Sequence, residues 1–216
     1  MRQIPAIDWC RLGSYGLCTR EVLTIDSPHI ITISGKAGAG KDTLGILLKN
    51  ALSVAGKRVL VTHYADPLKF ICHNLFGWDG QKNDIGRALL QYVGTDRIRK
   101  ADPDYFVRFL GWLIELFRDE WDYVVIPDAR FENEIDRMKM AFPTTAVFIN
   151  RTGYESQLSD EAQAHISENA LNDYRFDVVV ENETLEGLSR SSVALANFIM
   201  NPAKEWKGRT NSEVIK

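Results

Sequence analysis

The sequence predicts an α/β fold in which a five-stranded parallel sheet carries helices on both faces. Short β-branched and aliphatic runs alternate with longer segments whose apolar residues recur at helical spacing, the pattern of βαβ units. The short runs are apolar without alternation, as expected of parallel strands buried on both faces. Of the 216 residues, 45% are apolar and 25% charged. We therefore expect one domain around one sizeable core.

The first half of the chain supplies two strands. Residues 30–34 read Ile-Ile-Thr-Ile-Ser, a buried strand, and a glycine-rich turn and a helix with leucines at 44, 47, 48 and 52 follow it. Residues 58–63 form the second strand, and Pro67 opens a short helix that ends near Phe76. Two more helices, 85–93 and 105–117, complete a helical region.

The second half supplies three strands and two helices. The strands are expected at 123–126, 146–149 and 176–180, and the helices at 132–140 and 185–198. We assign the strongly apolar helix 105–117, which carries Phe109 and Trp112, to the core, with a dimer interface as the alternative. Ligands of such sheets lie beyond the carboxyl ends of the strands, so we expect the chemistry there.

Composition narrows the possible partners and compartments. The net charge of −3 implies no broad basic surface, so we expect no nucleic-acid polymer as a partner. The three cysteines, Cys10, Cys18 and Cys72, form no CxxC pair, which favours reduced thiols in a cytosol. Neither a secretory signal nor a membrane span is apparent, so we expect a soluble, cytoplasmic protein.

The strongest motif is a glycine-rich turn between the first strand and the helix after it. It fits G-x4-G-K in the strand–helix context of a P-loop. The glycines let the backbone curl so that N–H groups face phosphate oxygens, and the helix N-terminus favours anions. A chance glycine-rich turn is the alternative, which the context disfavours. The residues expected to hold a nucleoside triphosphate are Gly35, Lys36, Ala37, Gly38, Ala39, Gly40, Lys41, Asp42 and Thr43.

Two acids are candidates for holding Mg²⁺. Asp42 stands where many P-loops have a hydroxyl residue directly after the lysine, and its alternative role is to stabilise the helix N-terminus. Asp128 follows the third strand, as a Walker-B acid would, and could instead cap the next helix. Arg130 follows Asp128 by two residues. We expect it to face the same crevice, with a surface arginine as the alternative.

The residues after the second strand suit an acceptor site. Asp66 could orient an acceptor phosphate, contact a sugar hydroxyl or cap the helix at Pro67, since Asp-Pro is a common helix start. Lys69 could bind the acceptor phosphate or be solvated. Arg151 ends the fourth strand and opens a polar segment that we interpret as a lid, whose closure would exclude water.

A cationic segment at 87–100 could also bind phosphate. A kinase that phosphorylates a monophosphate must hold two anions together, and arginines grip phosphate oxygens bidentately. A solvated basic helix face is the alternative. The candidate substrate-binding residues here are Arg87, Gln91, Thr95 and Arg97, with Arg99 as a further cation.

Taken together, these residues resemble the deoxynucleoside monophosphate kinases of bacteriophages and related prophages. The most specific matches are the Gly-Lys-Asp-Thr loop at 40–43 and the run Asp-Ala-Arg-Phe-Glu-Asn-Glu at 128–134. Weaker matches are Ala-Asp-Pro-Leu-Lys at 65–69, Leu-Gln at 90–91 with Gly-Thr at 94–95, His-Ile-Ser-Glu at 165–168, and 177–182. His165 receives no catalytic role.

The resemblance implies a three-layer P-loop NTPase fold like that of the nucleoside monophosphate kinases. It implies transfer of the γ-phosphoryl group from ATP to a deoxynucleoside monophosphate. By the same resemblance, Lys41 and the loop glycines bind ATP, and Asp66, Arg87 and Arg130 lie at the acceptor site. With Asp128 these form the candidate catalytic set, and Arg151 joins the ATP-binding residues. The expected ligands are ATP, Mg²⁺ and small nucleotides, and a homodimer is a further possibility.

The sequence pattern also divides the chain. We expect an N-terminal extension at 1–28, a kinase domain at 29–200 and a polar tail at 201–216. Within the domain, the acceptor-binding helical region covers about 66–118 and the lid about 151–165. Two alternatives stay open: another P-loop kinase, acting on dephospho-coenzyme A or on modified bases in DNA, and a nucleotide-binding module without transfer activity.

Overall fold

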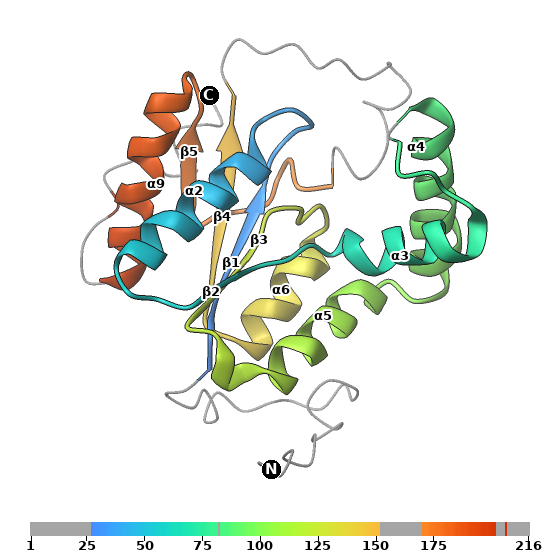
Figure 1. Cartoon of the computed structure of the whole chain (residues 1–216), viewed down its shortest axis with the longest axis horizontal. Helices are drawn as coiled ribbons and strands as arrows, with labels where there is room; N and C mark the ends of the chain where they lie inside the picture. The colour runs from blue at the N-terminus through green and yellow to red at the C-terminus, as the bar shows by residue number, and fades with distance from the viewer. Residues whose placement is uncertain (1–26, 82, 152–169, 202–205, 207–216) are drawn as a thin grey trace.

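The computed structural model describes residues 27–81, 83–151, 170–201 and 206. Its centre is a sheet of five parallel strands in the order β2-β3-β1-β4-β5 (Figure 1). The strands are β1 (His29–Ser34), β2 (Val59–Val61), β3 (Tyr123–Ile126), β4 (Thr144–Asn150) and β5 (Val178–Glu181). The predicted five-stranded parallel sheet with helices on both faces is therefore confirmed.

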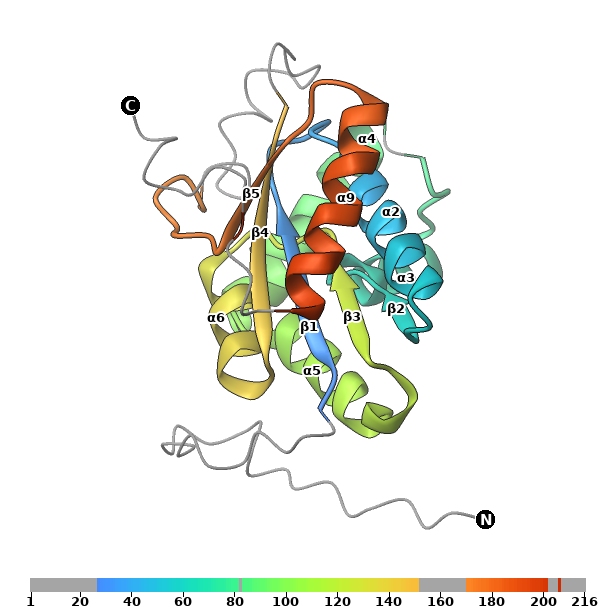
Figure 2. The same ribbon diagram turned by 90° about the vertical axis from the view of Figure 1, so that its left-hand side faces the viewer.

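Helices cover both faces of the sheet. Helices α2 (Lys41–Val54) and α9 (Leu185–Met200) pack together on one face, and α5 (Tyr105–Leu116) and α6 (Glu132–Ala141) lie on the other (Figure 2). Helices α3 (Ala65–Phe76) and α4 (Asp84–Gln91), the π-helix η1 (Tyr92–Arg99) and the 3-10 turn η2 (Arg118–Glu120) complete the described elements. The α3–α4 region extends beyond the sheet on the side away from α9 (Figure 1).

The sheet separates two apolar cores because successive side chains of a strand point to opposite faces. Ile31 and Ile33 of β1 pack with the leucines of α2 and α9, whereas Ile30 packs with side chains of α3, α5 and α6. One face of α5 is buried and Phe109 points outward, 39% exposed. The core assignment of this helix is thus borne out for one of its faces.

The topology places the carboxyl ends of β1 and β3 beside each other. The two strands are hydrogen-bonded neighbours, yet the chain continues from β1 into α2 on one face and from β3 into α6 on the other. In open α/β sheets, ligands bind at such a point of divergence. The loops after β1 and β3 are the two that contain the strongest sequence motifs.

The observed elements differ from the predicted ones mainly at their ends. The second strand is limited to three residues, and β5 begins two residues later than expected. Helix α3 begins before Pro67, because the side chain of Asp128 accepts hydrogen bonds from the first N–H groups of that helix. The helix expected to end at residue 93 continues directly into η1.

Several predicted segments fall partly or wholly outside the described residues. Most of the N-terminal extension, nearly all of the lid and most of the tail belong to this group, as do Cys10, Cys18 and His165. Cys72 is described and is buried as a free thiol. Within the described ranges, no helix is both long and apolar enough to span a membrane.

Candidate active site

The loop between β1 and α2 has the curled backbone that the motif predicts. Gly35, Gly38 and Gly40 have φ angles of 154°, 77° and 98°, which side-chain-bearing residues rarely adopt. A Cβ atom at Gly35 would lie 2.5 Å from the carbonyl oxygen of Ile149. Because Ile149 of β4 packs so closely against the loop, Gly35 has no room for a side chain. Its φ angle also favours glycine.

Asn182, directly after β5, fixes the far end of this loop. Its buried side-chain amide donates to the carbonyl oxygen of Ala39 at 2.8 Å, and a Cβ atom at Gly40 would lie 2.7 Å from the same nitrogen. Sequence reasoning gave Asn182 no role. The available signal was an amide residue at the carboxyl end of a buried strand.

Three cations lie along the loop. The Lys41 ammonium donates to the carbonyl oxygens of Gly35 at 2.6 Å and Lys36 at 2.9 Å. Arg151, at the end of β4, donates to the carbonyl oxygen of Gly38 at 3.0 Å. The Lys36 side chain turns away to Asn172 Oδ1 at 3.0 Å. Lys41 and Arg151, which were both predicted to bind ATP, are therefore in contact with the backbone of the loop.

His63, to which the sequence analysis gave no role, joins α2, the helix after the phosphate loop, to α3. His63 Nε2 lies 3.0 Å from Asp42 Oδ1, and its Nδ1 lies 3.5 Å from Asp66 Oδ2. The hydrogen bond to Asp42, opposed by desolvation, raises the pKa of His63, with further contributions from Asp128 and Asp66. The only sequence signal for His63 was its place at the end of the second predicted strand.

Asp66 and Lys69 form a pair in the first turn of α3. Lys69 Nζ donates to Asp66 Oδ1 at 2.9 Å, and the backbone N–H of His63 donates to Asp66 Oδ2 at 3.1 Å. Desolvation works against ionisation here, but the bond and charge of Lys69 lower the pKa of Asp66 overall. Asp66 therefore stabilises the start of α3 and holds the Lys69 ammonium at the same time.

Asp128 caps a helix other than the one considered in the sequence. Its Oδ1 accepts from the N–H of Tyr64 at 2.9 Å and its Oδ2 from the N–H of Ala65 at 3.0 Å. Burial raises the pKa of Asp128, although these two bonds and His63 oppose the shift. The alternative that Asp128 caps the following helix is wrong, because Phe131 occupies that N-cap position. Asp128 joins β3 to α3 instead.

Arg130 is held through its backbone. Glu134 Oε2 accepts from the N–H of Arg130 at 2.8 Å, and Glu134 Oε1 accepts from Arg99 Nη2 at 2.6 Å. The side chain of Arg99 thus ends at Glu134 rather than among solvent-exposed cations. Arg99 thus has a buried carboxylate as its partner, and the expectation that it also gathers the acceptor phosphate stays a prediction.

The remaining acceptor candidates share one continuous helix. Arg87 lies in α4 and is exposed, Gln91 is half-buried at its end, and Thr95 and Arg97 lie in η1. The guanidinium of Arg97 lies 5.7 Å from the ring centre of Tyr92. Gly94 packs η1 against α3, since a Cβ atom there would lie 2.7 Å from a methyl group of Leu68.

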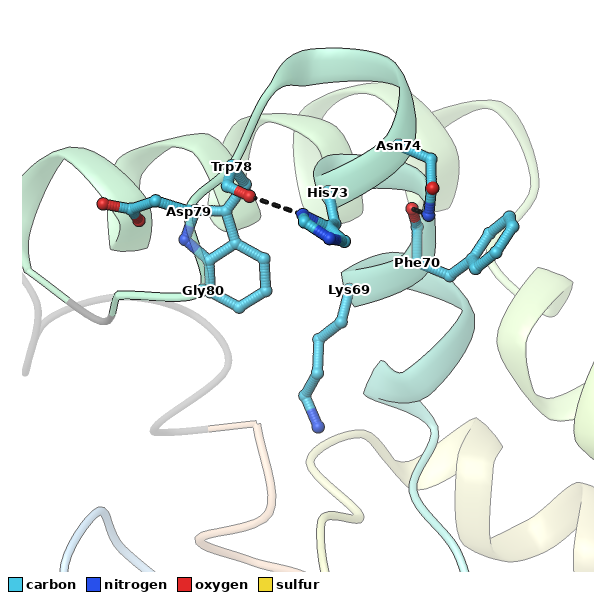
Figure 3. Close-up of a pocket in the computed structure, with 7 residues that line it drawn as sticks. All are labelled: Lys69, Phe70, His73, Asn74, Trp78, Asp79 and Gly80. Carbon is cyan, nitrogen blue, oxygen red and sulfur yellow. Dashed lines mark hydrogen bonds between the residues drawn. The ribbon is translucent and has the colours of Figure 1, made fainter.

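A pocket of about 340 Å³ opens beside α3 (Figure 3). His73 Nδ1 donates to the carbonyl oxygen of Trp78 at 2.8 Å, and the Trp78 indole N–H donates to the carbonyl oxygen of Gln81 at 2.9 Å. These bonds fix two flat aromatic groups in a pocket that the Lys69 side chain also lines. The lining residues are Lys69, Phe70, His73, Asn74, Trp78, Asp79 and Gly80.

The acids near the loop fit a Mg²⁺ ion that is bound mainly by phosphate and water. Among the described residues, no group of three or more His, Cys, Asp or Glu side chains could enclose a metal ion. Asp42, whose side chain is 74% exposed in the first turn of α2, and Asp128 are the available carboxylates. Mg²⁺ typically uses one or two carboxylates together with substrate phosphates.

The parallel sheet, the curled loop and the acids after β1 and β3 define a P-loop kinase. The chain belongs to the deoxynucleotide monophosphate kinase family, whose model matches residues 64–191. It is 30% identical over 189 residues to the deoxynucleotide monophosphate kinase of Enterobacteria phage T4, and the match covers 84% of this chain and 69% of that protein. The resemblance drawn from the sequence is therefore confirmed.

Solved kinase structures match the chain at low sequence identity and with TM-scores below 0.5. An APS kinase of Mycobacterium tuberculosis is 14% identical with a TM-score of 0.45, and the match covers 79% of this chain and 98% of that one. A gluconokinase of Sinorhizobium meliloti is 18% identical with a TM-score of 0.48, and the match covers 82% of this chain and 98% of that one.

Proposed function

We propose that this protein transfers the γ-phosphoryl group of ATP to a deoxynucleoside monophosphate and yields the diphosphate. The observation that carries the proposal is the contact between Asp42 and His63, at 3.0 Å. It joins the helix that follows the phosphate loop to the turn that precedes Asp66 and Lys69. A donor phosphate at the loop and an acceptor phosphate at α3 would then face each other. Family membership supports the same reaction.

The donor side relies on backbone amides and one lysine. The N–H groups of the loop and the positive end of α2 would hold the β- and γ-phosphates of ATP. Lys41 would exchange its two carbonyl contacts for phosphate oxygens. Arg151, already at the loop, is a further cation for the triphosphate. A Mg²⁺ ion near Asp42 and Asp128 would neutralise charge that develops between the phosphates.

The acceptor side relies on cations that surround a second anion. Lys69, Arg87, Arg97 and Arg130 are the proposed ligands of the monophosphate, with Gln91 and Thr95 as neutral donors beside them. Asp66 keeps the Lys69 ammonium in place. The acceptor phosphate is already anionic, so the reaction needs no strong general base. Catalysis then consists of positioning and charge neutralisation.

The pocket beside α3 suits the remainder of the acceptor nucleotide. Lys69 lies both in this pocket and beside Asp66, so a phosphate at Lys69 would direct its sugar and base along α3. The exposed Phe70 and His73 rings present aromatic surface on which a base can stack, and the buried Trp78 forms part of the pocket wall. We therefore propose that this pocket takes the base.

A substrate panel tests the reaction. The protein is incubated with ATP, Mg²⁺ and each common ribo- or deoxynucleoside monophosphate, and ADP is measured. We expect ADP formation that depends on at least one deoxynucleoside monophosphate. ATP binding without acceptor-dependent ADP would instead support the non-catalytic module, and preference for dephospho-coenzyme A would support the other kinase alternative. We expect the reaction to take place in the cytoplasm. The homodimer stays a prediction.

A further inference from the structure

Glu134, in the first turn of α6, is the most deeply buried acid next to the candidate site. It is 1% exposed. One carboxylate oxygen, Oε2, accepts from the backbone N–H groups of Arg130 at 2.8 Å and Phe131 at 3.2 Å. The other, Oε1, accepts from the Arg99 guanidinium at 2.6 Å. The two oxygens thus connect two segments that are distant in the sequence.

The Arg99 side chain is fixed as tightly as its partner. Its guanidinium carbon lies 4.5 Å from the ring centre of Phe106 and 4.7 Å from that of Phe131, and its side chain is 19% exposed. A guanidinium can lie with its flat face over aromatic rings and donate N–H groups to a carboxylate from its edge, whereas an ammonium has no flat face. The arrangement therefore requires arginine rather than lysine.

The π-helix aims Arg99 at this carboxylate. Helix α4 continues into η1, where the wider i→i+5 winding changes the direction in which each side chain points relative to an α-helix. Arg99 is the last residue of η1, and Arg87, Gln91, Thr95 and Arg97 precede it on the same helix. Contacts that hold Arg99 in place therefore also hold α4–η1, the helix that carries the proposed acceptor ligands.

We propose that Arg99 and Glu134 are positioning residues that hold the acceptor-binding helix α4–η1 and the Arg130 loop in one arrangement. The proposal rests on the proposed function for the meaning of that arrangement. Arg130 comes from the β3–α6 loop and Arg87 and Arg97 from α4–η1, yet all three are to grip one phosphate. Among the described residues, the ion pair between Arg99 and Glu134 links α4–η1 to the start of α6.

This placement also explains why a costly interaction is retained. Removing two charges from water costs free energy that a buried ion pair often fails to recover in stability. Well-packed apolar residues in its place would hold the fold at least as well. A pair kept for geometry should therefore affect acceptor binding more than stability.

The test separates positioning from stability by a double variant. Arg99→Met alone leaves Glu134 buried without its cation, and we expect it to lower the melting temperature and raise the acceptor KM. In Arg99→Met with Glu134→Gln, the amide oxygen keeps the bonds to Arg130 and Phe131, and no charge is left unpaired. We expect the melting temperature to recover, while the acceptor KM stays raised by roughly tenfold and the ATP KM changes little. Wild-type acceptor KM in the double variant would overturn the proposal.

Amide hydrogen exchange gives a second measurement that does not depend on turnover. We expect the amides of residues 92–99 to exchange roughly tenfold faster in the double variant, with strand amides unchanged. Unchanged exchange at 92–99 would overturn the link between the two segments. If the wild type transferred no phosphoryl group, the proposed function would fail, and the exchange result would still decide whether the pair holds η1.

A second ion pair serves as the matched control. Arg118 and Glu115 are in contact at 3.0 Å, with side chains 22% and 29% exposed, at the end of α5. Arg118→Met with Glu115→Gln removes a local, more exposed Arg–Glu pair outside the site. We expect both KM values and the exchange of 92–99 to stay at wild-type levels in this control. A rise in acceptor KM equal to that of the first double variant would also overturn the proposal.

Discussion

The imidazole of His63 lies 3.0 Å from the carboxylate of Asp42, so the helix after the phosphate loop is in contact with the turn that begins α3. The backbone N–H of His63 is in turn bound by Asp66 at 3.1 Å. The proposed donor and acceptor sites are thereby connected through one residue, His63.

Lys41→Ala is expected to abolish most of the activity without unfolding the protein. Lys41 is half-buried and its ammonium donates to the carbonyl oxygens of Gly35 and Lys36, so the substitution removes side-chain contacts but no backbone hydrogen bond of a strand or helix. We expect kcat to fall by roughly a hundredfold or more. Lys49→Ala, at an exposed lysine on the same helix, is the control. Near-normal turnover by Lys41→Ala would contradict the site.

Gly40→Ala is expected to raise the KM for ATP. A methyl group at Gly40 would lie 2.7 Å from the Asn182 amide nitrogen, and its φ of +98° disfavours any side chain. Gly56→Ala is the matched control: its φ is +76° but nothing lies within 4 Å of the added atom. We expect Gly56→Ala to cost only about 1 kcal/mol of stability, from backbone strain. Equal ATP KM values in the two variants would argue against ATP binding at the loop that contains Gly40.

Asp42→Asn is expected to raise the Mg²⁺ requirement. The carboxylate is 74% exposed at the start of α2, where it can reach a metal ion or its water. Replacing it with a neutral amide should raise the Mg²⁺ concentration for half-maximal rate by roughly tenfold. A Mg²⁺ titration at saturating ATP measures the effect, and a chelator should abolish the wild-type rate. An unchanged titration would contradict a metal role for Asp42 and leave its contact with His63 and its place at the helix start.

His29 is expected to make stability depend on pH. Burial lowers the pKa of His29 below 6.5, although Asp177 opposes the shift, and the ring bonds to the Thr145 hydroxyl at 2.8 Å. The unfolded chain therefore takes up this proton more readily than the folded one. The contribution is present above pH 6.5 and is lost as the pH falls through the lower folded value. Denaturant titrations at a series of pH values give the free energy of unfolding at each pH. Below pH 6.5 this free energy should fall less steeply with decreasing pH in His29→Gln than in the wild type. An identical slope would show that another group is responsible.

The sequence predicted the elements that are encoded locally. The β-branched run before Gly35 and the leucine spacing after it define a strand and a helix within about twenty residues, so the phosphate loop between them could be recognised directly. Tyr123–Ile126 was predicted at its observed bounds for the same reason. Strand order could not be predicted in this way, because it depends on pairings between distant segments.

The contacts that organise the site are long-range, and this is why the sequence did not reveal them. Asp128 is 63 residues from Ala65, and Arg99 is 35 residues from Glu134. Local spacing favoured a metal-side acid in the first case and a phosphate-binding arginine in the second. The π-helical winding of η1 also has no simple apolar period, so the helix expected to end at residue 93 was predicted too short.

Transfer of labelled phosphate tests the central claim most directly. ATP labelled at its γ-phosphate is incubated with Mg²⁺, the protein and a deoxynucleoside monophosphate identified by the substrate panel, and the products are separated. The account predicts that the label appears in the deoxynucleoside diphosphate in proportion to the ADP formed, and that Lys41→Ala transfers almost none. Label recovered only in inorganic phosphate, or remaining in ATP with every monophosphate, would contradict it.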